Sequence, residues 1–179
     1  MPLNLWHEID RGTLEELSVI IEIPKGSQNK YEIDKKTGLI ALDRANYSSA
    51  AYPFDYGFIP QTLWDDGDPL DVVLLTTFPL APGILVRVRP VAMMTMTDNG
   101  YSDAKIIAVP VEDKRWENTK DLEDLNSHTP KEFQHFFETY KALTEGENPV
   151  TVQGWSDKKS ALEAVQRSIE LYEEKFGKK

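Results

Sequence analysis

The stretch DDGDPLDVVLLTTF, residues 65–78, joins four carboxylates to an apolar run rich in β-branched residues. The run from residue 70 to residue 78 predicts a strand. Asp71 begins this run, so its side chain is held on a rigid element, and Pro69 restricts the link back to Asp68. A solvated acidic turn is the alternative interpretation. Carboxylates held together by stiff backbone against their own repulsion instead indicate a counter-ion.

Similar short runs, each bounded by Gly, Pro, Asp or Asn, recur along the chain. They predict further strands at residues 17–23, 30–34, 39–43, 83–91 and 104–110. No long helical crossover separates these strands, so the pattern favours a small closed barrel over a parallel sheet.

Two helices are expected towards the C-terminus. Thr129, Pro130 and Glu132 have the pattern of an N-cap, a first-turn proline and a capping-box partner, and a stop follows at Gly146. The second helix carries an apolar stripe with spacings of three and four, which should pack on the barrel. The residues of this stripe are Leu162, Val165, Ile169, Tyr172 and Phe176. The expected fold class is therefore α+β, a barrel flanked by two main helices.

Composition narrows the function. The 179 residues, 40% of them hydrophobic, fit one globular domain over residues 1–179. No segment approaches the roughly 20 apolar residues of a membrane-spanning helix, and the first ten residues do not resemble a secretory signal. The absence of Cys suits a reducing compartment, and the cytoplasm is the expected location. The net charge of −10 opposes binding to nucleic acid or anionic lipid.

Several familiar site types are excluded. No two glycines lie two residues apart, so a dinucleotide-binding G-x-G-x-x-G motif is absent, and there is no Walker loop or EF-hand pattern. The three histidines, His7, His128 and His135, are not spaced as a zinc site. Serine–histidine catalysis has no local signature either. An enzyme built from this sequence would work with carboxylates, cations and hard metals.

Oxygen-only clusters suit Mg²⁺ or Mn²⁺ better than zinc. A second acidic group, TDNGYSDAK, offers Asp98, Asp103 and Lys105, although residues 98–100 could equally form an ordinary β-turn. Glu22 lies within an apolar strand, where an unpaired carboxylate is costly. It either sits on the rim of the barrel or faces a cation.

Cations and phenols make the other half of the pattern. Each of them taken alone is more often a surface charge or a core aromatic. Near fixed carboxylates at strand ends, however, cations left over after the metals neutralise the acids can hold the oxygens of a polyanion. These residues, with one accompanying acid, are Lys30, Glu32, Arg44, Tyr56, Lys105, Tyr140 and Lys141.

The motifs IEIPKG…NKYEID, YPFDYGFIPQTL, DDGDPLDVV, MTDNGYSDAKIIAVP and HFFETYKALTEG resemble those of the soluble, Mg²⁺-dependent inorganic pyrophosphatases of family I. The resemblance covers roughly residues 17 to 176, and its D-x-D-P-x-D signature at residues 66–71 is highly specific. It implies a five-stranded OB-like barrel with flanking helices and hydrolysis of pyrophosphate to two phosphates. A cytoplasmic homohexamer is implied by analogy.

The resemblance also implies a role for each matching residue. Asp66, Asp71 and Asp103 would hold the tightest metal, with Asp71 shared with a second. Further metals, served by Glu22, Asp98 and Asp103, would arrive with substrate, and Glu32 would complete the acidic shell. Several Mg²⁺ ions would bind; Mn²⁺ or Zn²⁺ would substitute, and Ca²⁺ would inhibit.

Catalysis is assigned by the same resemblance to Asp68, Tyr56, Arg44, Lys30 and Lys105. Asp68 would orient and deprotonate the attacking water. The phosphoryl oxygens would be bound by Lys30, Arg44, Tyr56, Lys105, Tyr140 and Lys141, and the leaving phosphate would depart against Arg44, Tyr140 and Lys141. This chain departs from the family in having Asn99 where a second acid often follows Asp98. An amide there could hold a metal-bound water.

Two rival functions remain at this point. One is a non-catalytic OB-type module whose acidic loops hold structural Ca²⁺ or Mg²⁺; the acidic charge balance argues against its usual nucleic-acid ligand. The other is a metal phosphatase for nucleotides or longer polyphosphate. The compact acidic cluster favours the smaller substrate. Residues 1–16 receive no chemical role, and Tyr52 fits either the site or the core.

Overall fold

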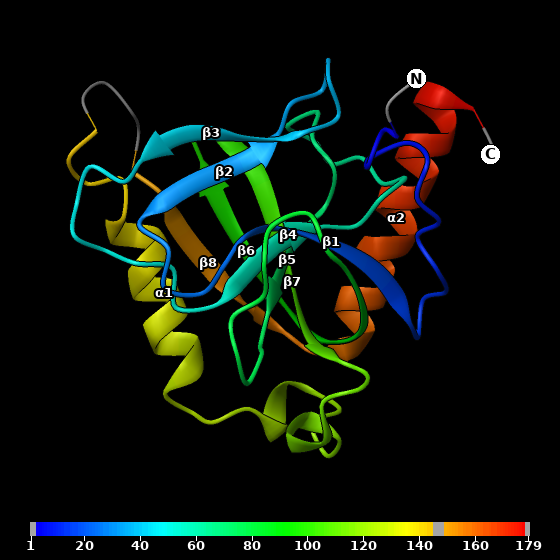
Figure 1. Ribbon diagram of the computed structural model, residues 1–179. Helices are drawn as coiled ribbons and strands as arrows, with labels where there is room; N and C mark the ends of the chain where they lie inside the picture. The colour runs from blue at the N-terminus through cyan, green and yellow to red at the C-terminus, as the bar shows by residue number, and fades with distance from the viewer. Residues whose placement is uncertain (1–2, 145–148, 178–179) are drawn as a thin grey trace.

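Five strands close into a ring in the computed structural model, which describes residues 3–144 and 149–177. Their order around the ring is β1–β4–β5–β7–β6, and β6 pairs again with β1 (Figure 1). The ring strands are β1 (Leu17–Ile23), β4 (Asp55–Phe58), β5 (Asp71–Leu74), β6 (Leu85–Asp98) and β7 (Tyr101–Pro110). The closed five-stranded barrel expected from the sequence is confirmed.

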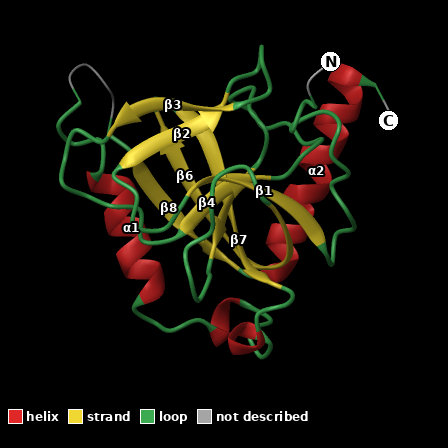
Figure 2. Ribbon diagram, viewed as in Figure 1, coloured by secondary structure: helices red, strands yellow, loops and turns green. Residues whose placement is uncertain are grey.

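The remaining elements surround this ring. Strand β8 extends the sheet by pairing with β6, while β2 and β3 form a separate hairpin. Figures 1 and 2 show this hairpin across the upper end of the barrel, with α1 and α2 at opposite sides. The bounds are β2 (Asn29–Ile33), β3 (Ile40–Ala45), β8 (Thr151–Ser156), α1 (Thr129–Thr139), α2 (Lys158–Phe176) and the 3₁₀ turns η1 (Lys114–Trp116) and η2 (Leu122–Asp124).

Ring closure depends on β1 and on the long strand β6. All seven residues of β1 are buried, with β4 and β6 covering its two edges; five of the seven are apolar, and Ser18 and Glu22 are the polar ones. The register of β6 against β7 shifts between Pro90 and Ala92. A proline has no N–H to give to the ladder, and such an irregularity bends a strand. The first part of β6 therefore pairs with β1 and its later part with β8.

Strands β5 and β7 run parallel within this closed ring. Their register sets Asp71, the first residue of β5, opposite Lys105. Two motifs from separate parts of the chain are thereby fixed side by side at one end of the barrel.

Helix α1 buries Phe133, Phe136 and Phe137 in an aromatic cluster with Phe54 and Tyr52. Tyr52 is thus a core residue.

The predicted cap of α1 is wrong. His128 is the N-cap residue and makes no side-chain capping bond, because Thr129 is already helical and the Glu132 amide donates to the carbonyl of His128. The proline at the helix start agrees with the sequence pattern. The helix ends at Thr139, before the expected stop at Gly146, which itself lies outside the described residues.

Helix α2 packs on the barrel as expected. Asp157 caps it by accepting a hydrogen bond from the Ser160 amide at 2.9 Å. Val165, Ile169 and Tyr172 are buried, whereas the last residue of the apolar stripe, Phe176, is 42% exposed. Neither α1 nor α2, in the part of the chain that the structure describes, has the length and apolar character needed to cross a membrane.

Strand β4 was not expected, and Gly57 explains why it can exist. A Cβ atom at this position would lie 2.0 Å from the carbonyl oxygen of Ile20 in β1. Glycine is therefore needed for close backbone approach, a feature that a propensity scale counts against a strand. Strand β8 was also missed, and β6 and β7 extend beyond the predicted bounds, to Asp98 and back to Tyr101.

Candidate active site

A cavity of about 260 Å³ lies where the hairpin meets the ring. Twelve of the thirteen site residues predicted from the sequence line it. They are Glu22, Lys30, Glu32, Tyr56, Asp66, Asp68, Asp71, Asp98, Asp103, Lys105, Tyr140 and Lys141. The remaining one, Arg44, stands opposite Lys30 in the hairpin register but is not among the lining residues, and its guanidinium lies 5.9 Å from the ring of Tyr47.

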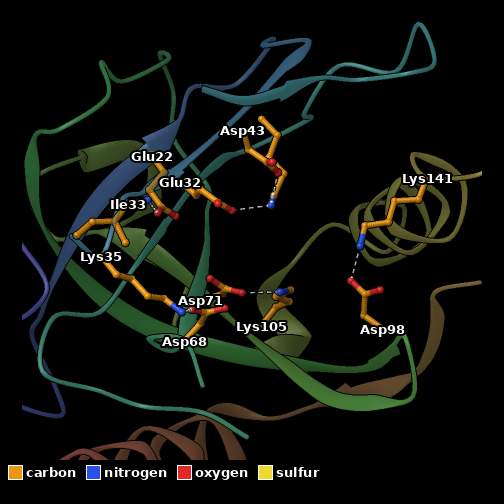
Figure 3. Close-up of polar contacts among 11 residues, drawn as sticks. Glu22, Glu32, Ile33, Lys35, Asp43, Asp68, Asp71, Asp98, Lys105 and Lys141 are labelled. Carbon is orange, nitrogen blue, oxygen red and sulfur yellow. Dashed lines mark hydrogen bonds and ion pairs between the residues drawn. The ribbon is translucent and has the colours of Figure 1, made fainter. Parts of the chain in front are cut away.

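Lys105 is the centre of the ring side of this cavity (Figure 3). Its Nζ lies 2.6 Å from Asp71 Oδ2 and 2.7 Å from Asp103 Oδ1, and its side chain is 4% exposed. Burial alone would lower the pKa of Lys105, but the two carboxylates raise it above its ordinary value. Burial raises the pKa of Asp103 to about 6 and outweighs the neighbouring ammonium. Asp71, Asp103 and Lys105 therefore remain charged, although removing these charges from water costs free energy.

Glu22 projects from β1 towards the hairpin and accepts a hydrogen bond from the amide of Ile33 at 2.7 Å. Burial, and after it the charge of Asp71, raises the pKa of Glu22 to about 8. Such a carboxyl group is poorly compensated by its protein neighbours, so a cation near it would be stabilising. Glu22 lines the cavity, and its role towards a cation stays a prediction.

The acidic loop is organised by its own backbone. The Trp64 amide donates to the carbonyl of Asp68 at 2.7 Å, and the Asp68 amide donates to Asp66 Oδ1 at 3.0 Å. Gly67 adopts φ 88, which glycine tolerates without strain. Burial raises the pKa of Asp66. The carboxylate of Asp68 forms an ion pair with Lys35.

On the α1 side, Lys141 lies 2.7 Å from Asp98 Oδ2. Asp98 Oδ1 is buried and has no hydrogen-bond partner among the described residues. Asn99 adopts φ 49 and Gly100 φ 83 in the turn between β6 and β7, so the ordinary turn is present, and Asp98 beside it lines the cavity. Burial raises the pKa of Tyr140, which packs beside this corner, well above its ordinary value.

The hairpin supplies the last part of the cavity wall. Lys30 Nζ lies 2.8 Å from Asp43 and 3.0 Å from Glu32. Burial alone would lower the pKa of Lys30, but its bonds to these two carboxylates raise it. Burial and the charge of Asp71 raise the pKa of Tyr56, which reaches in from β4, well above its ordinary value.

The donor set fits hard divalent cations, although no group of three or more Asp, Glu or His is close enough to hold one among residues 3–144 and 149–177. Lysines separate the carboxylates instead, as at Lys105. Asp98 has one buried oxygen without a hydrogen-bond partner among the described residues, and burial raises the pKa values of Glu22, Asp66 and Asp103. A cation beside these carboxyl groups would be stabilising. Oxygen ligands of this kind are those that Mg²⁺ prefers.

Sequence reasoning missed Lys35, Tyr31 and Asp43. Lys35 and Tyr31 line the cavity, and Asp43 pairs with Lys30. The sequence shows Lys35 and Lys36 as equivalent members of one charged turn, and nothing in it separates the two. Asp43 ends a predicted strand and precedes Arg44. Pairing this strand with the predicted strand that contains Lys30 would have indicated that Asp43 lies near Lys30.

A closed OB-like ring with a small cavity of carboxylates and ammonium groups defines an α+β protein suited to a small, highly charged ligand and its counter-ions. Comparison with known proteins narrows this class. A family model described as inorganic pyrophosphatase matches residues 19–173.

Individual relatives agree with that match. The inorganic pyrophosphatase of Haloferax volcanii is 45% identical over 176 residues, which cover 97% of this chain and 99% of that protein. That of Thermus thermophilus is 48% identical over 159 residues, 88% of this chain and 91% of its own. The crystal structure of inorganic pyrophosphatase from Thermus thermophilus has a TM-score of 0.92 at 46% identity and covers 96% of this chain and 99% of that chain. The chain belongs to the inorganic pyrophosphatase family.

Proposed function

We propose that this chain is a hydrolase that converts inorganic pyrophosphate to two phosphates. Membership of the pyrophosphatase family supports this function, and one observation about the site carries it furthest: a small cavity lined by both carboxylates and lysines. Such a lining can hold an anion and the divalent cations that accompany it. The reaction needs positioning and charge neutralisation rather than a covalent nucleophile, and the site offers Asp, Glu, Lys and Tyr.

Magnesium is the proposed metal, bound as several ions. Asp66, Asp71 and Asp103 would hold the tightest ion, and Glu22 and Asp98, with Asp103, would serve ions that enter with substrate. Glu32 extends the acidic wall. A divalent ion held there lowers the pKa of a water and neutralises phosphoryl charge. Mn²⁺ or Zn²⁺ should substitute, whereas Ca²⁺ should inhibit because its longer, looser coordination misplaces the reactants.

The chain's own groups then divide the remaining work. Asp68, on the acidic loop at the cavity edge, orients the attacking water and takes its proton. Lys30, Lys105 and Tyr56 bind the phosphoryl oxygens. The leaving phosphate is stabilised by Lys141, Tyr140 and Arg44; the last must reach in from β3, since it lies outside the present lining.

The size of the cavity favours pyrophosphate over a nucleotide. Pockets for drug-sized ligands measure about 300–1,000 Å³, and this one measures about 260 Å³. We further propose one pyrophosphatase domain spanning residues 1–179, a cytoplasmic location and a homohexamer, all by analogy with the family. The net charge of −10 supports the absence of a nucleic-acid partner.

Phosphate release from pyrophosphate tests this function. Purified protein should release phosphate in millimolar Mg²⁺, and a chelator should abolish the release. ATP and tripolyphosphate serve as competing substrates. Absence of release from pyrophosphate in a series of Mg²⁺, Mn²⁺ and Zn²⁺ would show that the assignment is wrong, and faster release from ATP would favour a nucleotide phosphatase.

A further inference from the structure

Lys35 is a charged group of the cavity that none of the roles above uses. It lies in the turn between β2 and β3, and its side chain crosses from the hairpin to the acidic loop, where its Nζ pairs with Asp68 Oδ1 (Figure 3). It also lines the cavity, and its Nζ lies 6.0 Å from the ring of the buried Trp6.

The turn holds the backbone of Lys35 in place. The Asp34 side chain accepts hydrogen bonds from the Lys36 amide at 3.1 Å and the Thr37 hydroxyl at 2.7 Å, and the Gly38 amide donates to the Asp34 carbonyl at 2.7 Å. A fixed backbone with a long side chain gives an ammonium group that can reach one carboxylate or swing away into solvent.

Exposure separates this ion pair from the one at Lys105. The side chains of Lys35 and Asp68 are 53% and 48% exposed, and an exposed pair of this kind is worth about 0.2–1 kcal/mol. Lys105 is enclosed by Asp71 and Asp103 and stays with them. Of these two cavity lysines, Lys35 is therefore the one that can leave its partner at small cost.

We propose that Lys35 is a further active-site residue, the counter-ion that holds Asp68 in the metal-free protein and that gives way when divalent cations and water enter. This inference rests on the proposed function of the same site. The positive charge of Lys35 offsets the repulsion between Asp68 and its acidic neighbours while the cavity is without metal. Because that charge also opposes metal entry, Lys35 lowers the affinity of the empty site for divalent cations.

Mn²⁺ binding by calorimetric titration tests the proposal without any need for turnover. Lys35→Gln should raise the Mn²⁺ affinity about twofold to fivefold, the ratio that an exposed ion pair supports. Lys35→Arg, which keeps the charge, should restore the wild-type affinity. Lys36→Gln is the matched control, because it removes the same charge from the adjacent, exposed position and should change the affinity much less.

A double-mutant cycle with Asp68→Asn isolates the pair. Once Asp68 is replaced, Lys35→Gln should have no larger effect than Lys36→Gln. Equal effects of Lys35→Gln and Lys36→Gln in the wild-type background would overturn the proposal, and so would a Lys35→Gln effect that survives Asp68→Asn. Thermal unfolding of each variant checks that it is folded.

The outcomes also separate this inference from the proposed function. A protein that binds Mn²⁺ with the expected Lys35 dependence but releases no phosphate would overturn the pyrophosphatase assignment and keep Asp68 and Lys35 as partners. If the protein hydrolyses pyrophosphate but replacement of Lys35 does not change its Mn²⁺ affinity, the pyrophosphatase assignment stands and the proposed role of Lys35 is overturned. Absence of Mn²⁺ binding by the wild type would overturn both.

Discussion

The cavity has two walls that are built differently. The ring wall places Asp71, Asp103 and Lys105 on the paired strands β5 and β7, where strand register and burial fix each side chain. The hairpin wall stands on β2 and β3, of whose residues Ile33 is the one that is buried. In the proposed function this difference becomes a division of labour, in which the ring would fix the positions of metal ions and the hairpin would adjust the charge around them.

The largest effect is expected where the acidic loop meets both walls. Asp68→Asn keeps the shape of the side chain but removes a proton acceptor, so turnover should fall about 10²–10⁴-fold. The variant should remain folded because Asp68 is half-exposed and its backbone bonds stay. Steady-state phosphate release and a thermal melt measure the two properties. Near-normal turnover would remove Asp68 from the role of base.

Removing the central cation of the ring wall should cost stability as well as activity. Lys105→Met leaves Asp71 and Asp103 facing each other without a counter-charge, and loss of one partner of a buried pair costs about 3–5 kcal/mol. Urea unfolding in chelator measures this loss, and added Mg²⁺ should recover part of it. Lys36→Met, on the exposed turn, is the control and should leave stability unchanged. Equal stability of Lys105→Met and wild type in chelator would contradict a rigid ring wall.

At the α1 corner, Lys141→Ala should weaken substrate binding or turnover, because Lys141 is proposed to hold a phosphoryl oxygen beside Asp98. Stability should fall less than in Lys105→Met, since the side chain of Lys141 is 14% exposed and that of Lys105 is 4% exposed. The ratio kcat/KM and the melting temperature, measured together, distinguish the two roles. A large loss of stability with normal kinetics would make Lys141 a structural residue.

The smallest effect is expected far from both walls, at the cap of α2. Hydrogen bonds from the Ser160 backbone and side chain lower the pKa of Asp157 below its ordinary 3.8. The cap therefore stabilises the fold above that pH and loses its contribution as the pH falls through the folded pKa. Asp157→Ala should lower the melting temperature at neutral pH by a few degrees at most, and the difference should vanish in acid.

Asp157→Asn, which keeps an acceptor at the cap, is the matched control for that pH dependence. Its melting temperature should stay near the wild-type value at neutral pH. Mn²⁺ affinity should be unchanged in both variants of Asp157. A change in metal affinity would mean that the stability of α2 is coupled to metal binding in the cavity. The two walls alone would then not account for metal binding.

Much of the fold could be predicted because most strands of the ring are short apolar runs that are recognisable from their own sequence. The apolar run after Pro69 predicted β5, and its first residue, Asp71, stands at the strand start as expected. Strand β4 could not be predicted, because the reason for Gly57 is the backbone of β1, thirty-odd positions away. The N-cap of α1 was mispredicted for a local reason. The helix begins at Thr129, one residue earlier than the pattern indicated, so His128 is the N-cap.

The candidate site was readable to a similar extent. The resemblance brought together residues from five motifs, and their side chains do line one cavity, while their individual roles stay predictions. Arg44 does not line the cavity, and its guanidinium lies near the ring of Tyr47 instead. Lys35 escaped notice because its importance arises from one long-range ion pair across the cavity, which composition and spacing cannot show.

Closure of the ring by β1 and β6 also sets an order of events while the chain is being made. Residues Leu17 to Ile20 pair with Val88 to Leu85, so a growing chain that stops short of residue 85 carries β1 with one edge open. An apolar strand with an open edge is a template for aggregation. On the ribosome the first half of this protein must therefore be kept apart from its neighbours until the second half has been translated and can seal it.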